Sequence, residues 1–193
     1  MNTITEKRKH LYVFIIFIFQ FFSLVNYLHA QKDTLFWFAA PNASSGLGDA
    51  PVAIHLTAYS NPATVTLSIP ANVGFTPITV SVPANTHQQV DLSSFLTSIE
   101  SPAGNVVSNN GIKIISSALI SASYSINSTN NKELFSLKGV NGLGTNFYTP
   151  FQKYWANSTS TPASFSSIDI VATQDNTTVL VTPRTAITGH AAN

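Results

Sequence analysis

The chain has 193 residues, a formal net charge of +1, no cysteine, and charged side chains at only 9% of its positions. The missing cysteine excludes disulfides, thiolate metal sites, a cysteine nucleophile and a lipid-modified N-terminal cysteine. The sparse charge offers no basic patch that could neutralise a phosphate backbone, which argues against nucleic acid as a partner.

The first thirty residues show the three zones of a secretory signal. Lys7–Lys9 is basic, Leu11–Phe22 is apolar, and a more polar exit ends at Ala30. We predict a signal peptide over residues 1–30, cleaved after Ala30, and therefore a secreted or cell-surface protein that meets a membrane only during export. The alternative is an uncleaved membrane anchor, because Leu11–Leu28 nearly reaches the roughly 17–25 residues that a bilayer requires.

The remaining residues, about 160 of them, suffice for one sandwich-sized domain. Alternating apolar and polar stretches that end at proline, glycine or polar turns predict strands. One helical turn is expected within Leu92–Ile99. The predicted strands, in chain order, are Thr34–Ala40, Val52–Ser60, Ala63–Ile69, Ile78–Val82, Gln88–Leu92, Gly111–Ile115, Leu119–Ile126, Asn146–Tyr148, Phe165–Ala172 and Thr177–Val181.

An internal repeat supports an all-β fold. Ile54–Ser68 returns in degenerate form as Ile168–Thr182, at a constant offset of 114 (168 − 54). Each copy alternates, turns through polar residues, alternates again and stops at proline, which predicts a β-hairpin used twice. A third strand, Ile78–Val82, follows the first copy, whereas the chain ends where the second copy would have one. We therefore expect an all-β, antiparallel β-sandwich-like module over residues 31–193. Its second unit is expected to be incomplete and to continue beyond residue 193 in the full protein.

Three stretches carry a resemblance to a known family: Ala63–Pro70, Ser136–Gln152 and Ile168–Pro183. The most specific is Leu-Lys-Gly…Leu-Gly-Thr-x-Phe-Tyr-x-Pro within Ser136–Gln152. Together they resemble the N-terminal module of large secreted surface proteins of gliding-type bacteria, which is related to the IgGFc-binding protein N-terminal domain. The resemblance implies a β-rich extracellular module at the start of a longer protein, commonly followed by adhesion-type repeats. Immunoglobulin binding does not carry over, because no residue set for it can be placed on this chain.

No motif indicates catalysis. The histidines after the predicted signal, His55, His87 and His190, are separated from carboxylates at ligand spacing, and His55 is expected on the face opposite Ile54 and Leu56. No Gly-x-Ser-x-Gly elbow is present. The glycine run 139–144 lacks a P-loop ending, so we interpret it as a tight turn that needs a positive φ. The sequence thus predicts no catalytic residue, no metal, no cofactor and no enzyme activity.

The carboxylates are few and scattered, and structural roles are expected for them. A glycosidase would need a facing pair, which could only be assembled in space. Calcium is the least implausible metal, with Asp49 beside Gly48, but only one carboxylate lies there. The carboxylates after the predicted signal are Asp33, Asp49, Asp91, Glu100, Glu133, Asp169 and Asp175.

Aromatic residues cluster at Tyr148, Phe151, Tyr154 and Trp155, and Trp37 alternates against its neighbours. Buried, such residues build the core that a disulfide-free domain needs, and we favour that reading. Exposed, they would form a platform for sugars, so Tyr148, Tyr154 and Trp155 are the candidate ligand-contact residues.

Two functions remain from the sequence. The first is a non-catalytic extracellular or cell-surface module that supports adhesion or cell-envelope interaction, with an unknown surface protein or glycan as partner. The alternative is a carbohydrate-binding module or part of a glycan-active enzyme.

Overall fold

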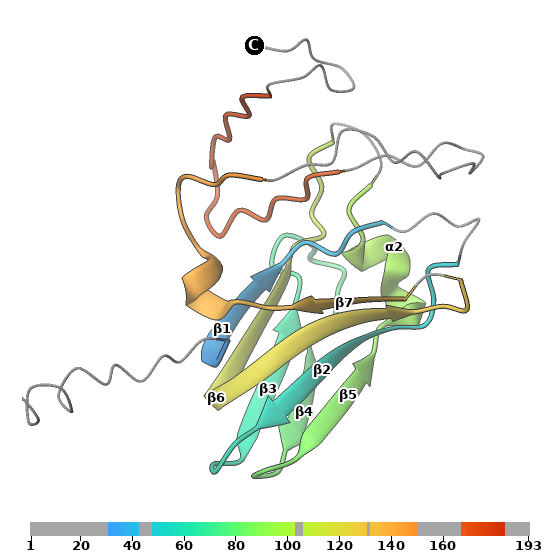
Figure 1. Ribbon diagram of the computed structural model, residues 1–193, viewed down its shortest axis with the longest axis vertical. Coiled ribbons are helices and arrows are strands. Elements are labelled where there is room, and N and C mark those ends of the chain that lie inside the picture. Colours follow the sequence, from blue (N-terminus) through green and yellow to red (C-terminus); the bar gives the residue numbers. More distant parts are fainter. Residues whose placement is uncertain (1–30, 43–47, 103–105, 131, 150–166, 184–193) are drawn as a thin grey trace, which may run out of the picture. The chain divides into compact units, whose positions relative to one another are not determined.

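A computed structural model describes residues 31–42, 48–102, 106–130, 132–149 and 167–183 (Figure 1). Internal contacts divide the chain into Met1–Ala30 and Gln31–Asn193, and the described strands belong to the second unit. Within the described ranges, no helix has the length and apolarity needed to cross a bilayer. The strands are β1 (Asp33–Phe38), β2 (Val52–Ala58), β3 (Ala63–Ser68), β4 (Ile78–Val82), β5 (His87–Asp91), β6 (Ile112–Asn127) and β7 (Lys132–Ser136), and the helical turns are η1 (Ser93–Phe95), α2 (Leu96–Ile99) and η2 (Gly139–Gly142).

The fold is all-β, as predicted, and its ladders are antiparallel. Strand β6 organises it, because its two halves have different neighbours. The first half lies between β1 and β3, and the second half lies between β2 and β7. The result is a nearly closed sheet folded over on itself, with β1, β3 and β4 in one layer and β2, β5 and β7 in the other (Figure 1).

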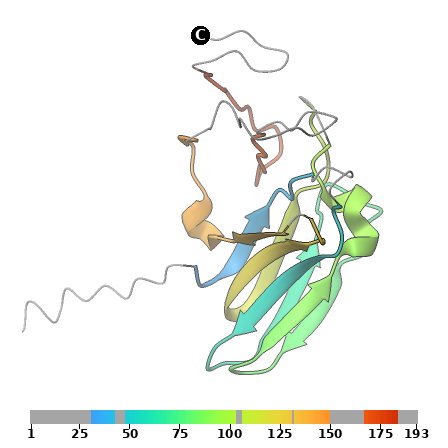
Figure 2. The same cartoon turned by 45° about the vertical axis from the view of Figure 1, so that its right-hand side comes forward.

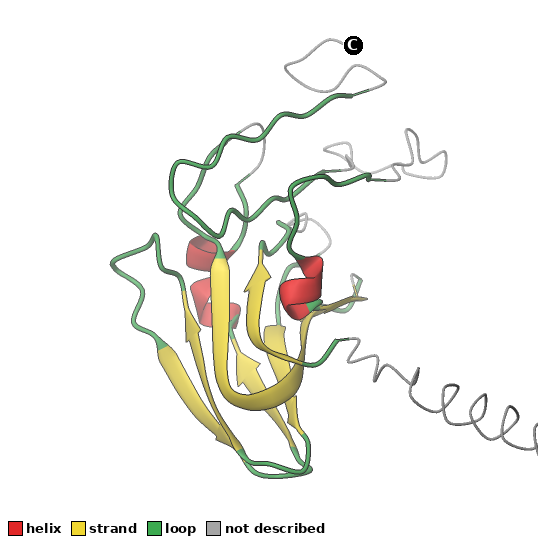
Figure 3. Ribbon diagram, turned by 90° about the vertical axis from the view of Figure 1, so that its left-hand side faces the viewer, coloured by secondary structure: helices red, strands yellow, loops and turns green. Residues whose placement is uncertain are grey.

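The segment Gly111–Ile126 was expected to hold two short strands, and this expectation is wrong. It is one continuous strand that turns through a bend (Figure 3). Its even-numbered residues point inward on both sides of the bend, from Ile112 to Ile126, so the inward face never changes. At the bend the Ser116 hydroxyl donates to the Ala118 carbonyl, 2.7 Å away, and the Ser117 hydroxyl accepts from the Thr64 amide at 2.9 Å. These serine hydroxyls supply backbone partners where the ladder is interrupted.

The first predicted hairpin is also wrong in its pairing. Both strands form, but β2 pairs with β5 and β6, while β3 pairs with β4 and β6. The connection from Tyr59 to Pro62 therefore carries the chain from one layer to the other. The β4–β5 connection does the same, and the Tyr59 carbonyl accepts from the Asn85 amide at 2.7 Å, so both crossings lie at one end (Figure 2). Strands β2 and β3 thus form one arm of a long hairpin, and β4 and β5 form the other, with β3 paired to β4 and β2 paired to β5. Both arms cross from one layer to the other midway along their length.

The space between the layers holds a single core cluster. Inward side chains of the strands fill this space, because successive residues of a strand point to opposite faces of the sheet. Phe38, Tyr124 and Phe135 form an aromatic group whose ring centroids lie 5.0–6.2 Å apart. Ile99 of α2 is 1% exposed and joins the same cluster, as expected for a helical turn within Leu92–Ile99. The largest fully buried side chains are Tyr124, Phe36, Ile54, Leu56, Leu67, Leu92, Ile99, Ile114, Ile120, Val52, Val65 and Val82.

The second copy of the repeat does not form the predicted strands. Residues 167–183 contain a turn at 173–176, where Asn176 has a φ of 58°, but no strand. Most of their apolar side chains are exposed, with Ile170 at 52% and Leu180 at 89%, whereas Val171 is half-buried. A two-stranded hairpin is marginal in water without further strands or an apolar surface to cover. The first copy meets that need because β6 pairs with both of its strands. The predicted strand at Asn146–Tyr148 is likewise absent from the described residues.

The glycine run begins with the tight turn that was predicted. Gly139 has a φ of 60° and opens η2, and the Val140 amide donates to Asp33 Oδ2 at 2.8 Å. The other Asp33 oxygen accepts from the Thr34 amide at 2.7 Å. One carboxylate thus joins the start of β1 to the turn that follows β7.

Replacing Gly139 should destabilise the protein. A Cβ at this position would lie 2.5 Å from Asp33 Cβ and Oδ2, and the backbone has a positive φ. We expect Gly139→Ala to lower the free energy of unfolding by more than about 1 kcal/mol, measured by urea denaturation. The matched control is Gly74→Ala, since Gly74 has an ordinary φ and its nearest neighbour would be 3.4 Å away. Equal losses in the two variants would contradict this account.

Candidate functional site

The outer face of the β5–β2–β6–β7 layer carries rows of polar side chains. Outward residues of neighbouring strands form rows across it, set by the ladder register. One row is Gln89, His55, Ser123 and Ser136, and the adjacent row is His87, Thr57 and Ser121. These side chains are small or uncharged, so the face can offer many short hydrogen bonds with little long-range field.

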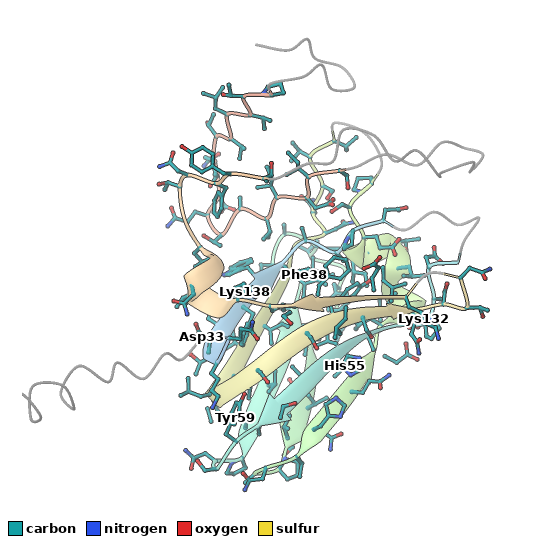
Figure 4. All side chains as sticks on the ribbon, viewed as in Figure 1. Asp33, Phe38, His55, Tyr59, Lys132 and Lys138 are labelled. Carbon is teal, nitrogen blue, oxygen red and sulfur yellow. The ribbon has the colours of Figure 1, made fainter. Side chains whose placement is uncertain are left out.

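An open groove of about 340 Å³ lies on this face. Its lining includes His55, Gln89 and Ser125. Lys132, Glu133 and Leu134, which is 67% exposed, also line it. Figure 4 shows His55 on β2 and Lys132 at the start of β7.

His55 and His87 meet on this face, although 32 positions separate them (87 − 55). His55 Nδ1 and His87 Nε2 are 3.1 Å apart, and the rings are nearly parallel, with centroids 5.3 Å apart. The other ring nitrogen of His55 lies 2.8 Å from Ser125 Oγ. Partial burial, and then the neighbouring His87, lower the pKa of His55 below its ordinary value. The sequence correctly placed His55 on the face opposite Ile54 and Leu56, but it did not predict the contact with His87.

A second group of polar residues lies inside the fold. Glu100 is 7% exposed and Tyr124 is fully buried. Among the described atoms, Glu100 Oε1 and the Tyr124 hydroxyl have no hydrogen-bond partner. Burial, and then the nearby Asp49 carboxylate, raise the pKa of Glu100 to about 7. Burial, and then Glu100 and Asp49, also raise the pKa of Tyr124. The fold therefore brings Asp49 and Glu100 into electrostatic contact, which their spacing of 51 positions could not reveal.

The predicted aromatic site lies mostly outside the described residues. Tyr154 and Trp155 fall in residues 150–166. Tyr148 is described and 98% exposed, so the favoured expectation of core packing is wrong for this residue. Trp37 faces away from the buried Phe36, as alternation predicted, and lies on the outer face of the β1–β6–β3–β4 layer. Lys113 Nζ is 5.2 Å from the centroid of its indole ring. His190 also lies outside the described residues.

Across the described part of the chain, no group of three or more histidine, cysteine, aspartate or glutamate side chains is arranged to hold a metal ion. Comparisons with protein-family models, with curated proteins and with solved structures found no match to this chain.

Glu100 should make stability depend on pH. Its pKa is about 7 in the folded protein and near 4.5 when unfolded, so the folded state binds the proton more tightly between these values. This contribution to stability is complete below pH 4.5, falls as pH rises toward 7, and is constant above that. We expect a loss on the order of 2 kcal/mol between pH 4.5 and 8, measured by urea denaturation.

Glu100→Gln is the control for this effect, because it keeps the shape and removes the titration. It should flatten the dependence between pH 4.5 and 8 and make the protein more stable than the wild type at pH 8. An unchanged slope in this variant would assign the pH dependence to other groups.

Proposed function

We propose that this chain is a non-catalytic extracellular module that supports adhesion or cell-envelope interaction. The observation that carries the proposal is the outer face of the β5–β2–β6–β7 layer. Rows of serine, threonine, glutamine and histidine cross this face. An open groove on the same face is lined by His55, Gln89 and Ser125 and also by Lys132, Glu133 and the exposed Leu134. Such a face suits a polar, uncharged partner such as a glycan or the backbone and amides of a surface protein.

Export is the second part of the proposal. It rests on the three-zone pattern of residues 1–30 and on a domain that relies on its core without cysteine. The resemblance to the N-terminal modules of gliding-bacterial surface proteins points the same way. In this proposal the signal is removed after Ala30, and the module begins just before β1.

Export can be tested directly on the natural protein. We expect N-terminal sequencing of protein recovered from the cell surface or medium to begin at Gln31, within one or two residues. Replacing Ala30 by a bulky residue, as in Ala30→Phe, should slow processing, because the peptidase pocket requires a small side chain there. Protein that stays inside the cell with Met1 intact would refute export.

The alternative is a carbohydrate-binding module that uses aromatic side chains. It is favoured by Trp37, which is held on the outer surface beside Lys113, and by the exposed Tyr148. The indole of Trp37 would stack on a sugar ring. The hydroxyls of Thr66 and Thr79, 3.2 Å apart on β3 and β4 of the same layer, would supply hydrogen bonds.

A binding experiment separates the two faces. Beads coated with the protein are offered envelope preparations and a glycan array, using wild type, Ser123→Glu on the polar face and Thr66→Glu on the Trp37 face. We expect Ser123→Glu to weaken binding at least about 10-fold, because it places an uncompensated charge in the contact. Thr66→Glu is the matched control and should leave binding within about 2-fold.

Two outcomes would contradict the proposal. Wild-type protein that binds neither envelope components nor glycans would remove the adhesion function. Binding that is lost in Trp37→Ala and kept in Ser123→Glu would move the function to the aromatic alternative.

A further inference from the structure

The contact between the imidazoles of His55 and His87 was not predicted from the sequence, and the proposed function does not depend on it. Both imidazoles stand on the outer face, one on β2 and one on β5, in diagonal positions of one ladder, because Thr57 is opposite His87 and Gln89 is opposite His55. Their nearest nitrogens are 3.1 Å apart. In a direct hydrogen bond, one of these two nitrogens carries the proton and the other offers a lone pair.

Ser125 can fix which nitrogen of His55 offers its lone pair. Its Oγ lies 2.8 Å from His55 Nε2. When the Nε2–H of His55 donates a hydrogen bond to this hydroxyl oxygen, His55 Nδ1 is unprotonated and faces His87. This is the arrangement found around metal-bound histidines, whose second ring nitrogen donates to a nearby oxygen. His87 is exposed, so its Nδ1 can keep a proton toward solvent and its Nε2 can face His55 with a lone pair.

The distance between the two nitrogens suits a shared metal ion once the rings rotate toward it, because at a centroid separation of 5.3 Å the two lone pairs point largely at each other. With metal–nitrogen bonds of about 2.0–2.1 Å, two nitrogens 3.1 Å apart subtend roughly 95–102° at the metal. That angle lies between the 90° of square-planar or octahedral sites and the 109° of tetrahedral sites. Neutral imidazole is a preferred ligand of Zn²⁺, Ni²⁺ and Cu²⁺, whereas Ca²⁺ and Mg²⁺ prefer oxygen.

We infer that His55 and His87 form a two-histidine site for a divalent transition metal on the outer face of the β5–β2–β6–β7 layer, with Ser125 orienting His55. The protein supplies two ligands, and the other positions on the metal remain open to water or to a ligand from a partner. The ion is therefore exchangeable. The site does not depend on the adhesion proposal, since it rests on the positions of three side chains.

Metal titration of the intact protein tests the site. Calorimetry with Ni²⁺ and with Zn²⁺ should show one ion bound per chain, and the melting temperature should rise with the metal concentration, because the ion binds only the folded pair. His55→Ala and His87→Ala should each weaken this binding more than about 10-fold. His190→Ala is the matched control and should bind as the wild type does. Circular dichroism without metal verifies that each variant is folded.

A spectroscopic measurement counts the ligands. Electron paramagnetic resonance of the Cu²⁺-loaded protein should show coupling to two imidazole nitrogens, and either histidine variant should reduce this to one. Ser125→Ala should keep two nitrogens but weaken binding about 10-fold, as expected for loss of an orienting partner.

Three results would overturn the inference. Binding that is unchanged in the double variant His55→Ala/His87→Ala would place the metal elsewhere. A wild-type protein that binds none of the three ions would remove the site. Wild-type affinity in Ser125→Ala would remove the orienting role of the hydroxyl.

Discussion

Strand β6 is the constraint on which the rest of the structure depends. It is the only described strand that pairs with four others, and it contributes to both layers of the fold. Because its inward face is continuous from Ile112 to Ile126, a single alternating sequence lines the core on both sides of the bend. The bend needs backbone partners of its own, and the hydroxyls of Ser116 and Ser117 supply them. The two arms of the long hairpin, β2–β3 and β4–β5, cross between the layers beside the bend in β6, since Ala58 pairs with Ile120 and Val65 with Ser116.

This dependence explains which parts of the fold could be predicted. Alternation fixes which side chains face inward, so the positions of β1, β4 and β5 were correct to within one or two residues. It does not say which strand lies alongside, because a paired hairpin and a chain crossing between layers present the same inward residues. The β2–β3 hairpin was therefore predicted wrongly, although both of its strands exist. The second copy shows the converse: residues 167–183 keep the pattern without forming a ladder. Pattern alone does not make a strand when no neighbour pairs with it.

The features of the candidate sites can be separated in the same way, into those set by local alternation and those set by strand pairing. The outward orientation of His55 and Trp37 follows from local alternation and was predicted. The contact between His55 and His87 depends on the register of β2 against β5, which is set only when the two arms fold together. The proximity of Asp49 and Glu100 likewise depends on how the loop before β2 meets the segment after α2. No spacing in the sequence carries this information, since both contacts join residues from different arms or loops.

The low charge of the chain bears on the binding proposed for this outer face. Encounter between the two surfaces receives little electrostatic steering, so association proceeds near the uncharged rate and depends weakly on salt. Affinity then comes from short hydrogen bonds, each contributing modestly because water competes for it. In the proposed adhesion function, a single module would bind weakly, and strong attachment would require many copies acting together or a linked chain that presents several modules. A polar sheet face of this type is consequently better suited to reversible, multivalent contact with an extended surface than to tight capture of one soluble ligand.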